Sequence, residues 1–139
     1  MKRKGTSIIF VNDKSEILLL LRDNLPEIPY PNMWDIPGGH VEDGETPEGC
    51  IIREMKEELN VNLGEFDLFS MTEFKDRIEY TFWKKVTFDI NQLKLHEGQK
   101  LKWFTEEEAN NKDLAFGFNQ IVESFFLKRP FNIAEKIRG

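Results

Sequence analysis

The chain reads GHVEDGETPEGCIIREMKEELNV from Gly39 to Val61, and this segment constrains structure and chemistry more than any other. It sets a glycine-containing loop before a helix that carries Glu54, Glu57 and Glu58. Positions i, i+3 and i+4 share one helical face, so three carboxylates crowd onto a narrow stripe. Such a stripe indicates a site for a hard divalent cation, because Mg²⁺ binds through carboxylates, water and substrate phosphates. The commoner alternative is a solvated helix whose acids are balanced by neighbouring basic residues.

The same helix has an apolar face and marked ends. The side chains spaced for packing on a sheet are Ile51, Ile52, Met55 and Leu59. Thr46 is suited to the N-cap and Pro47 to the first helical position. Asn60 is suited to a left-handed stop at the C-terminus. We therefore expect a helix between Thr46 and Asn60 that holds the acids on a fixed scaffold.

The preceding segment, Trp34–Glu45, runs from a short apolar strand into the paired glycines Gly38 and Gly39. Glycine lets the backbone approach a ligand closely, so that a carbonyl or amide can contact a metal or a phosphate. A Gly-Gly pair alone is more often a simple turn. Next to the acidic stripe, it favours a ligand site over a solvated helix.

These residues resemble the signature of the Nudix hydrolases, G-x5-E-x7-R-E-U-x-E-E-x-G-U, in which U is a bulky apolar residue. The matching residues are Gly39, Glu45, Arg53, Glu54, Met55, Glu57, Glu58 and Val61. Only Asn60 departs, in place of the last glycine, and asparagine is the next most tolerant residue for a left-handed stop. The resemblance implies an α/β fold, the Nudix α/β/α sandwich with a mixed central β-sheet. We expect residues 1–139 to form a single Nudix hydrolase domain.

The remaining patterns fit such a sheet. We expect a first strand that ends before a turn at residues 12–15, followed by strands at Ile17–Leu21, Leu68–Glu73, Ile78–Phe88 and Leu101–Phe104. We expect two further helices, at Thr105–Asn110 and Asn119–Lys128. The proline-rich stretch Asp23–Met33 is expected to form a stiff lip beside the site.

Composition narrows the possible partners. The net charge of −6 argues against a nucleic-acid polymer, which normally requires a basic stripe. Cys50 is the only cysteine, so no intrachain disulfide is possible, and we expect a cytoplasmic protein. The N-terminal apolar run is too short for a signal peptide or a membrane span. The expected partner is a small-molecule nucleoside diphosphate derivative, with no membrane, bound by a monomer or homodimer.

The resemblance also implies roles for the signature residues. Glu54, Glu57 and Glu58 match the family's metal ligands, and the Gly39 carbonyl commonly joins them; Mg²⁺ is the implied cofactor and Mn²⁺ a possible substitute. Either Glu54 or Glu57 is expected to accept the proton of the attacking water. Arg53 matches a residue that holds these carboxylates in place. Glu45 is expected to support the loop and the metal ligands from behind.

Three residues outside the signature are further candidates. Glu97 occupies a position where antimutator-type triphosphate pyrophosphatases of the family often place another metal-associated glutamate; the alternative is a solvated turn residue. Arg22 resembles an arginine that meets substrate phosphate there, or else forms a surface salt bridge. Asn119 resembles an asparagine that reads an oxidised purine, or else caps a helix. His40 and His96 are expected to be loop residues, because Mg²⁺ prefers oxygen ligands.

Three functions remain open at this point. The first is hydrolysis of a nucleoside triphosphate, with an oxidised purine nucleotide such as 8-oxo-dGTP as a candidate substrate. The second is a nucleotide-sugar or ADP-ribose pyrophosphatase. The third is a Nudix module that binds a nucleotide without cleaving it, although the complete set of Arg53, Glu54, Glu57 and Glu58 argues against this.

Overall fold

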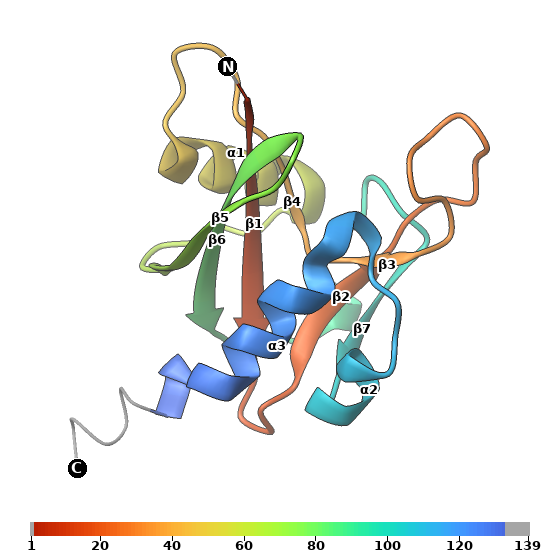
Figure 1. Cartoon of the computed structure of the whole chain (residues 1–139). Helices are drawn as coiled ribbons and strands as arrows, with labels where there is room; N and C mark the ends of the chain where they lie inside the picture. Colours follow the sequence, from red (N-terminus) through yellow and green to blue (C-terminus); the bar gives the residue numbers. More distant parts are fainter. Residues whose placement is uncertain (1, 133–139) are drawn as a thin grey trace.

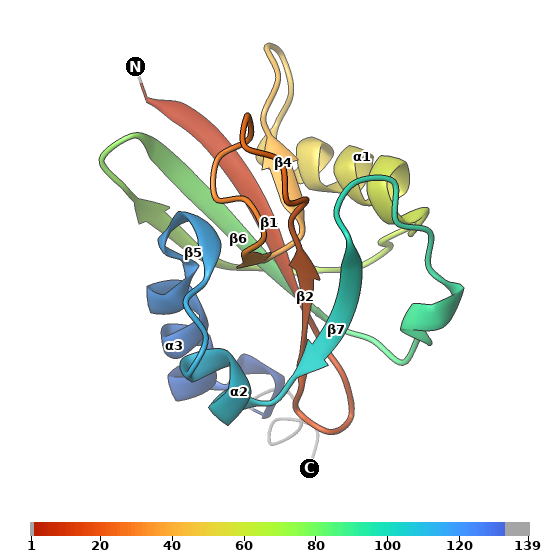
Figure 2. The same cartoon turned by 90° about the vertical axis from the view of Figure 1, so that its right-hand side faces the viewer.

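The computed structural model describes residues 2–132, which form a seven-stranded mixed sheet flanked by helices (Figure 1). Its strands are β1 (Arg3–Val11), β2 (Ile17–Leu21), β3 (Trp34–Asp35), β4 (Gly38–His40), β5 (Asp67–Glu73), β6 (Arg77–Lys85) and β7 (Lys100–Phe104). The helices are α1 (Pro47–Leu59), α2 (Glu106–Asn110) and α3 (Phe118–Lys128), with short 3₁₀ turns at Ile90–Gln92 and Ala115–Gly117. Central strand β1 runs parallel to β6 and antiparallel to β2 and β4. Helices α1 and α3 lie on opposite sides of the strands (Figure 2), which confirms the expected α/β/α sandwich.

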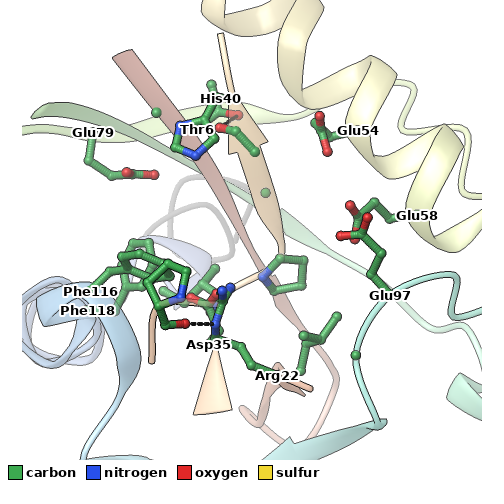
Figure 3. Close-up of a pocket in the computed structure, with 18 of the residues that line it drawn as sticks. Thr6, Arg22, Asp35, His40, Glu54, Glu58, Glu79, Glu97, Phe116 and Phe118 are labelled. Carbon is green, nitrogen blue, oxygen red and sulfur yellow. Dashed lines mark hydrogen bonds and ion pairs between the residues drawn. The ribbon is translucent and has the colours of Figure 1, made fainter. Parts of the chain in front are cut away.

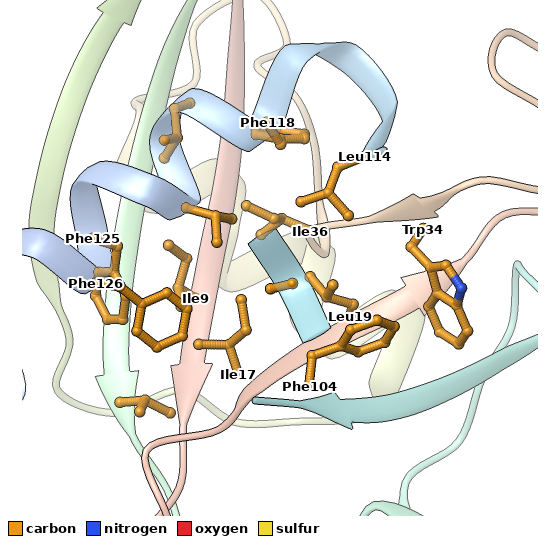
Figure 4. Packing of buried hydrophobic residues seen from close by; sticks show 14 of the residues in the cluster. Ile9, Ile17, Leu19, Trp34, Ile36, Phe104, Leu114, Phe118, Phe125 and Phe126 are labelled. Atoms are coloured by element: carbon orange, nitrogen blue, oxygen red, sulfur yellow. The ribbon is translucent and has the colours of Figure 1, made fainter. Parts of the chain in front are cut away.

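Each face of the sheet covers its own hydrophobic core. Alternate residues of β1 point to opposite faces, so Ile8 packs on the α1 side and Ile9 on the α3 side. The α3 side is rich in aromatic rings, among them Phe104, Phe125 and Phe126 (Figure 4). Strand β1 therefore contributes residues to both cores.

Helix α1 begins and ends as the sequence predicts. The Thr46 hydroxyl accepts a hydrogen bond from the Gly49 amide at 3.0 Å, and Asn60 adopts the left-handed conformation with φ 56° and ψ 38°. One expectation for its apolar face is wrong: Ile52 is 47% exposed, because it lies on the solvent side of the helix. Nowhere in residues 2–132 is a helix long and apolar enough to cross a membrane.

Besides shifts of one residue at the starts of β5, β6 and β7, the structure differs from the sequence-based expectation in three places. Gly38 and Gly39 belong to strand β4, which pairs with Ser7 and Thr6 of β1, instead of the expected loop. Strand β6 ends at Lys85, before the predicted Phe88, because its parallel partner β1 ends opposite at Val11. Helix α3 begins one residue early, and its N-cap is the left-handed Gly117; the alternative role of Asn119 as a helix cap is therefore wrong.

Candidate functional site

A cleft of about 830 Å³ opens between α1, strands β1, β4 and β6, and the loops before β3 and β7. Residues from the signature line one end of it, with Glu54 and Glu58 on α1 (Figure 3). The opposite end is lined by Glu79, Phe116 and Phe118. This volume is in the range of clefts that hold small-molecule ligands.

The acidic end gathers carboxylates from two separate parts of the chain. The loop before β7 is tied to α1, because the His96 amide donates to the Glu58 carbonyl at 3.1 Å, and this turns Glu97 toward Glu58 (Figure 3). Burial raises the pKa of Glu58 to about 7, with further contributions from the charges of Glu97 and Glu54. Burial likewise raises the pKa of Glu54. Both shifts show that burial, and secondarily the neighbouring carboxylates, disfavours the ionised form of these two side chains.

Arg53 organises the signature carboxylates. Its Nε and Nη2 atoms donate to the two oxygens of Glu45 at 2.7 and 3.0 Å, and its Nη1 donates to Glu54 at 2.8 Å and Glu57 at 3.3 Å. The guanidinium lowers the pKa of Glu45 to about 2. Glu45 also accepts the Glu42 amide at 3.1 Å, which fixes the turn before α1. Arg53 therefore joins the loop before α1 to the carboxylates of Glu54 and Glu57.

Gly39 lies directly under Glu54. Its carbonyl accepts the Thr6 hydroxyl at 3.1 Å, and a Cβ at this position would lie 2.6 Å from both carboxylate oxygens of Glu54. Only glycine leaves room for the carboxylate here. Strand β4 therefore places the Gly39 backbone against the Glu54 carboxylate.

The donor chemistry at the acidic end fits a hard divalent cation. It offers carboxylate oxygens from Glu54, Glu57, Glu58 and Glu97 in surroundings where their charges repel one another. Within residues 2–132, however, no three acidic, histidine or cysteine side chains form a group already closed enough to hold a metal. Glu54 faces Arg53, and Glu57 is 61% exposed. Holding an ion thus requires these side chains to close around it.

Arg22 lies in the cleft and forms an ion pair with the buried Asp35, instead of the surface salt bridge that was the sequence-based alternative. Its Nη1 lies 3.2 Å from the Asp35 carboxylate, and its guanidinium stacks on the Phe116 ring at 4.9 Å. Asp35 is 8% exposed, and burial raises its pKa to about 6 against the opposing effect of Arg22. A pocket-facing arginine held in this way can meet an anionic group.

Sequence reasoning missed Asp35, Arg77 and Glu79. Glu79 is 3% exposed, and its Oε1 accepts from Arg77 Nε at 2.7 Å. In the sequence it belongs to the polar side of an alternating strand, a pattern typical of solvent exposure. The signal that could have found it is the charged pair Arg77 and Glu79 on the same face of a central strand, where charge is rarely buried without a reason.

The structure does not bring Asn119 to this cleft. Its Oδ1 accepts the Leu114 amide at 2.8 Å, and its Nδ2 donates to the Lys112 carbonyl at 2.7 Å. The side chain thereby closes the loop before α3. Of the two histidines, His40 lines the cleft from β4, whereas His96 lies in the loop before β7. The thiol of Cys50 is buried, and burial raises its pKa to about 11.

Comparisons with known proteins agree with this geometry. The model of the NUDIX domain matches residues 1–125. The chain is 37% identical over 108 residues to an 8-oxo-dGTP diphosphatase of Escherichia coli, covering 76% of the chain and 81% of that protein. It is 29% identical over 119 residues to a CTP pyrophosphohydrolase of the same organism, covering 84% and 88%.

A second bacterial relative and a solved structure are also similar to this chain. The chain is 29% identical over 106 residues to a putative 8-oxo-dGTP diphosphatase of Bacillus subtilis; the match covers 74% of the chain but only 66% of that protein. The crystal structure of a MutT protein from Methanosarcina mazei superposes with a TM-score of 0.74 and 26% identity, covering 92% of this chain and 95% of that one. The structural similarity thus covers most of both chains.

Proposed function

The chain belongs to the Nudix hydrolase family, and from this premise we propose that it hydrolyses the pyrophosphate linkage of a nucleoside triphosphate with the help of Mg²⁺. An oxidised purine nucleotide such as 8-oxo-dGTP is the candidate substrate. The observation that carries the proposal is that the two ends of the cleft differ: carboxylates from α1 and the β7 loop meet at one end, and aromatic rings line the other. A nucleotide bound through a cation would match both ends, with its phosphates at the carboxylates and its flat base at the aromatic rings.

The signature residues and Glu97 divide into a group that would hold the cation and a group that positions it. Glu54, Glu57, Glu58 and Glu97, with the Gly39 carbonyl, would hold the cation. When bound, the cation neutralises phosphate charge and makes water easier to deprotonate. Glu54 or Glu57 accepts the proton of that water, and the arginine network described above keeps both in position. Water is consumed, one phosphoanhydride bond breaks, and a nucleoside monophosphate and pyrophosphate are released.

The experiment is a panel of nucleotides incubated with Mg²⁺, scored by product identity. We expect triphosphates to give the monophosphate and pyrophosphate, and we expect Glu57→Gln to lower turnover at least about 100-fold while the protein stays folded. The matched control is Glu48→Gln, which removes the same charge from the exposed first turn of α1. The control should keep its turnover.

Other outcomes would point to the alternative functions. Cleavage of ADP-ribose or a nucleotide sugar without cleavage of triphosphates would move the substrate to the second class. Tight nucleotide binding without any product would identify a binding module. Near-normal turnover of Glu57→Gln at limiting Mg²⁺ would contradict the assignment of the metal site.

A further inference from the structure

Glu79 carries a buried carboxylate oxygen that accepts no hydrogen bond from residues 2–132. The side chain is 4% exposed, and its Oε1 is bound by Arg77, but its Oε2 has no hydrogen-bond partner among the side chains and backbone of residues 2–132. The neighbouring Ser7 hydroxyl pairs with Thr81 at 2.9 Å. A charged acceptor without a partner is costly to bury, so its retention at this position needs an explanation.

The orientation of Glu79 indicates a ligand. The residue lines the cleft, and its carboxylate points into it from β6 (Figure 3). Burial raises the pKa of Glu79, while the Arg77 guanidinium and, to a smaller extent, the Ser7 hydroxyl act in the opposite direction. Gly5 keeps the space beside it clear, since a Cβ there would lie 2.6 Å from Glu79 Oε1. Arg77 thus holds Oε1 in place, while Oε2 has no hydrogen bond within residues 2–132.

The surroundings of Glu79 are suited to a flat ring. Phe116 and Phe118 line the same end of the cleft, and the Phe116 ring packs against Tyr30 with ring centroids 4.6 Å apart and planes tilted by 56°. Arg77 donates to the Phe116 carbonyl at 3.0 Å, which couples the aromatic wall to the carboxylate. Phe116 has a left-handed φ of 57°, a strained conformation of the kind found at ligand sites.

We propose that Glu79 selects the base of the nucleotide by accepting a hydrogen bond from an exocyclic amino group. The inference deepens the proposed function and rests on it. The cleft would prefer guanine over hypoxanthine and cytosine over uracil, because each preferred base carries an amino group that its counterpart lacks. Since Asn119 is committed to the loop before α3, Glu79 takes the role of reading the base.

Glutamine at position 79 gives a sharp test. Arg77 donates to Oε1, so it should hold the oxygen of the new amide and leave the NH₂ group where Oε2 lies. The acceptor then becomes a donor with almost no change in shape. This substitution should remove the preference for cytosine and favour the uracil O4 acceptor instead.

The experiment compares kcat/KM on two matched pairs, dGTP with dITP and CTP with UTP. Wild-type protein should prefer the amino-bearing member of each cleaved pair by at least about tenfold, and Glu79→Gln should abolish or reverse that ratio. Glu73→Gln is the control, because Glu73 lies on neighbouring β5 with a 70% exposed side chain paired to Lys2. Its ratios should match the wild type.

Binding supplies a second measurement that needs neither turnover nor a variant. Calorimetry on the wild type should give tighter binding of dGMP than dIMP, and of CMP than UMP. Equal values within both pairs, by kinetics and by binding, would overturn the role of Glu79, as would unchanged ratios in a folded Glu79→Gln protein. If triphosphates are not cleaved at all but the binding preference holds, the proposed function fails and the base-reading role of Glu79 stands.

Discussion

The carboxylate of Glu54 occupies the space that a side chain at position 39 would need, with both oxygens 2.6 Å from the position of a Cβ on Gly39. We therefore predict that Gly39→Ala displaces Glu54 and lowers Mg²⁺-dependent turnover by roughly 100-fold or more. The free energy of unfolding should change by less than about 1 kcal/mol, because the displaced group is the end of a flexible side chain. Steady-state kinetics and thermal unfolding test the two parts.

The control for this prediction is Gly64→Ala. Gly64 has a φ of 62°, and a Cβ there would meet nothing within 4 Å, so alanine introduces backbone strain without any collision. That variant should lose about 1 kcal/mol of stability and keep its turnover. Gly39→Ala that retains wild-type turnover would show that Glu54 has another position from which it works equally well.

Asn60 replaces the glycine of the family signature and adopts the left-handed conformation that glycine would. Its backbone N–H donates to the Lys56 carbonyl at 3.2 Å, and the backbone N–H of Val61 donates to the Met55 carbonyl at 3.1 Å. Asn60→Val should destabilise the protein by about 1–2 kcal/mol, because a β-branched residue avoids this conformation. Asn60→Gly should be nearly neutral in activity. Equal melting temperatures of wild type and Asn60→Val would contradict this account.

The sequence was sufficient for features that depend on near neighbours. The ends of α1 follow from Thr46 and Asn60, and the order of the acids along one helical turn places Glu54 and Glu58 on one side. The family signature then specifies the layers around them. Features that depend on distant partners could not be read in this way. The end of β6 is set by the length of β1, and the burial of Glu79 depends on what covers its face of the sheet.

The pKa of Asp35 predicts a specific dependence of stability on pH. Burial raises this pKa from its ordinary 3.8 to about 6, so the folded protein binds more protons than the unfolded chain between these values. Its contribution to stability therefore falls as pH rises through this window, by up to about 3 kcal/mol, and is restored on acidification. Asp35→Asn lacks the titration. Its stability relative to wild type should rise between pH 4 and about 7, as measured by chemical denaturation; parallel curves would contradict the prediction.

Substitution of Asn119 distinguishes its structural role in the loop before α3 from the purine-reading role that the sequence suggested. Its side chain accepts the Leu114 amide at 2.8 Å and donates to the Lys112 carbonyl at 2.7 Å, so Asn119→Ala removes two hydrogen bonds that close a loop. We predict a loss of about 1–2 kcal/mol of stability with unchanged discrimination between 8-oxo-dGTP and dGTP. Arg22→Ala, by contrast, should weaken all nucleotides alike, because it lines the cleft and offers positive charge to any phosphate. Loss of purine discrimination in Asn119→Ala at an unchanged melting temperature would return the base-reading role to Asn119 and remove it from Glu79.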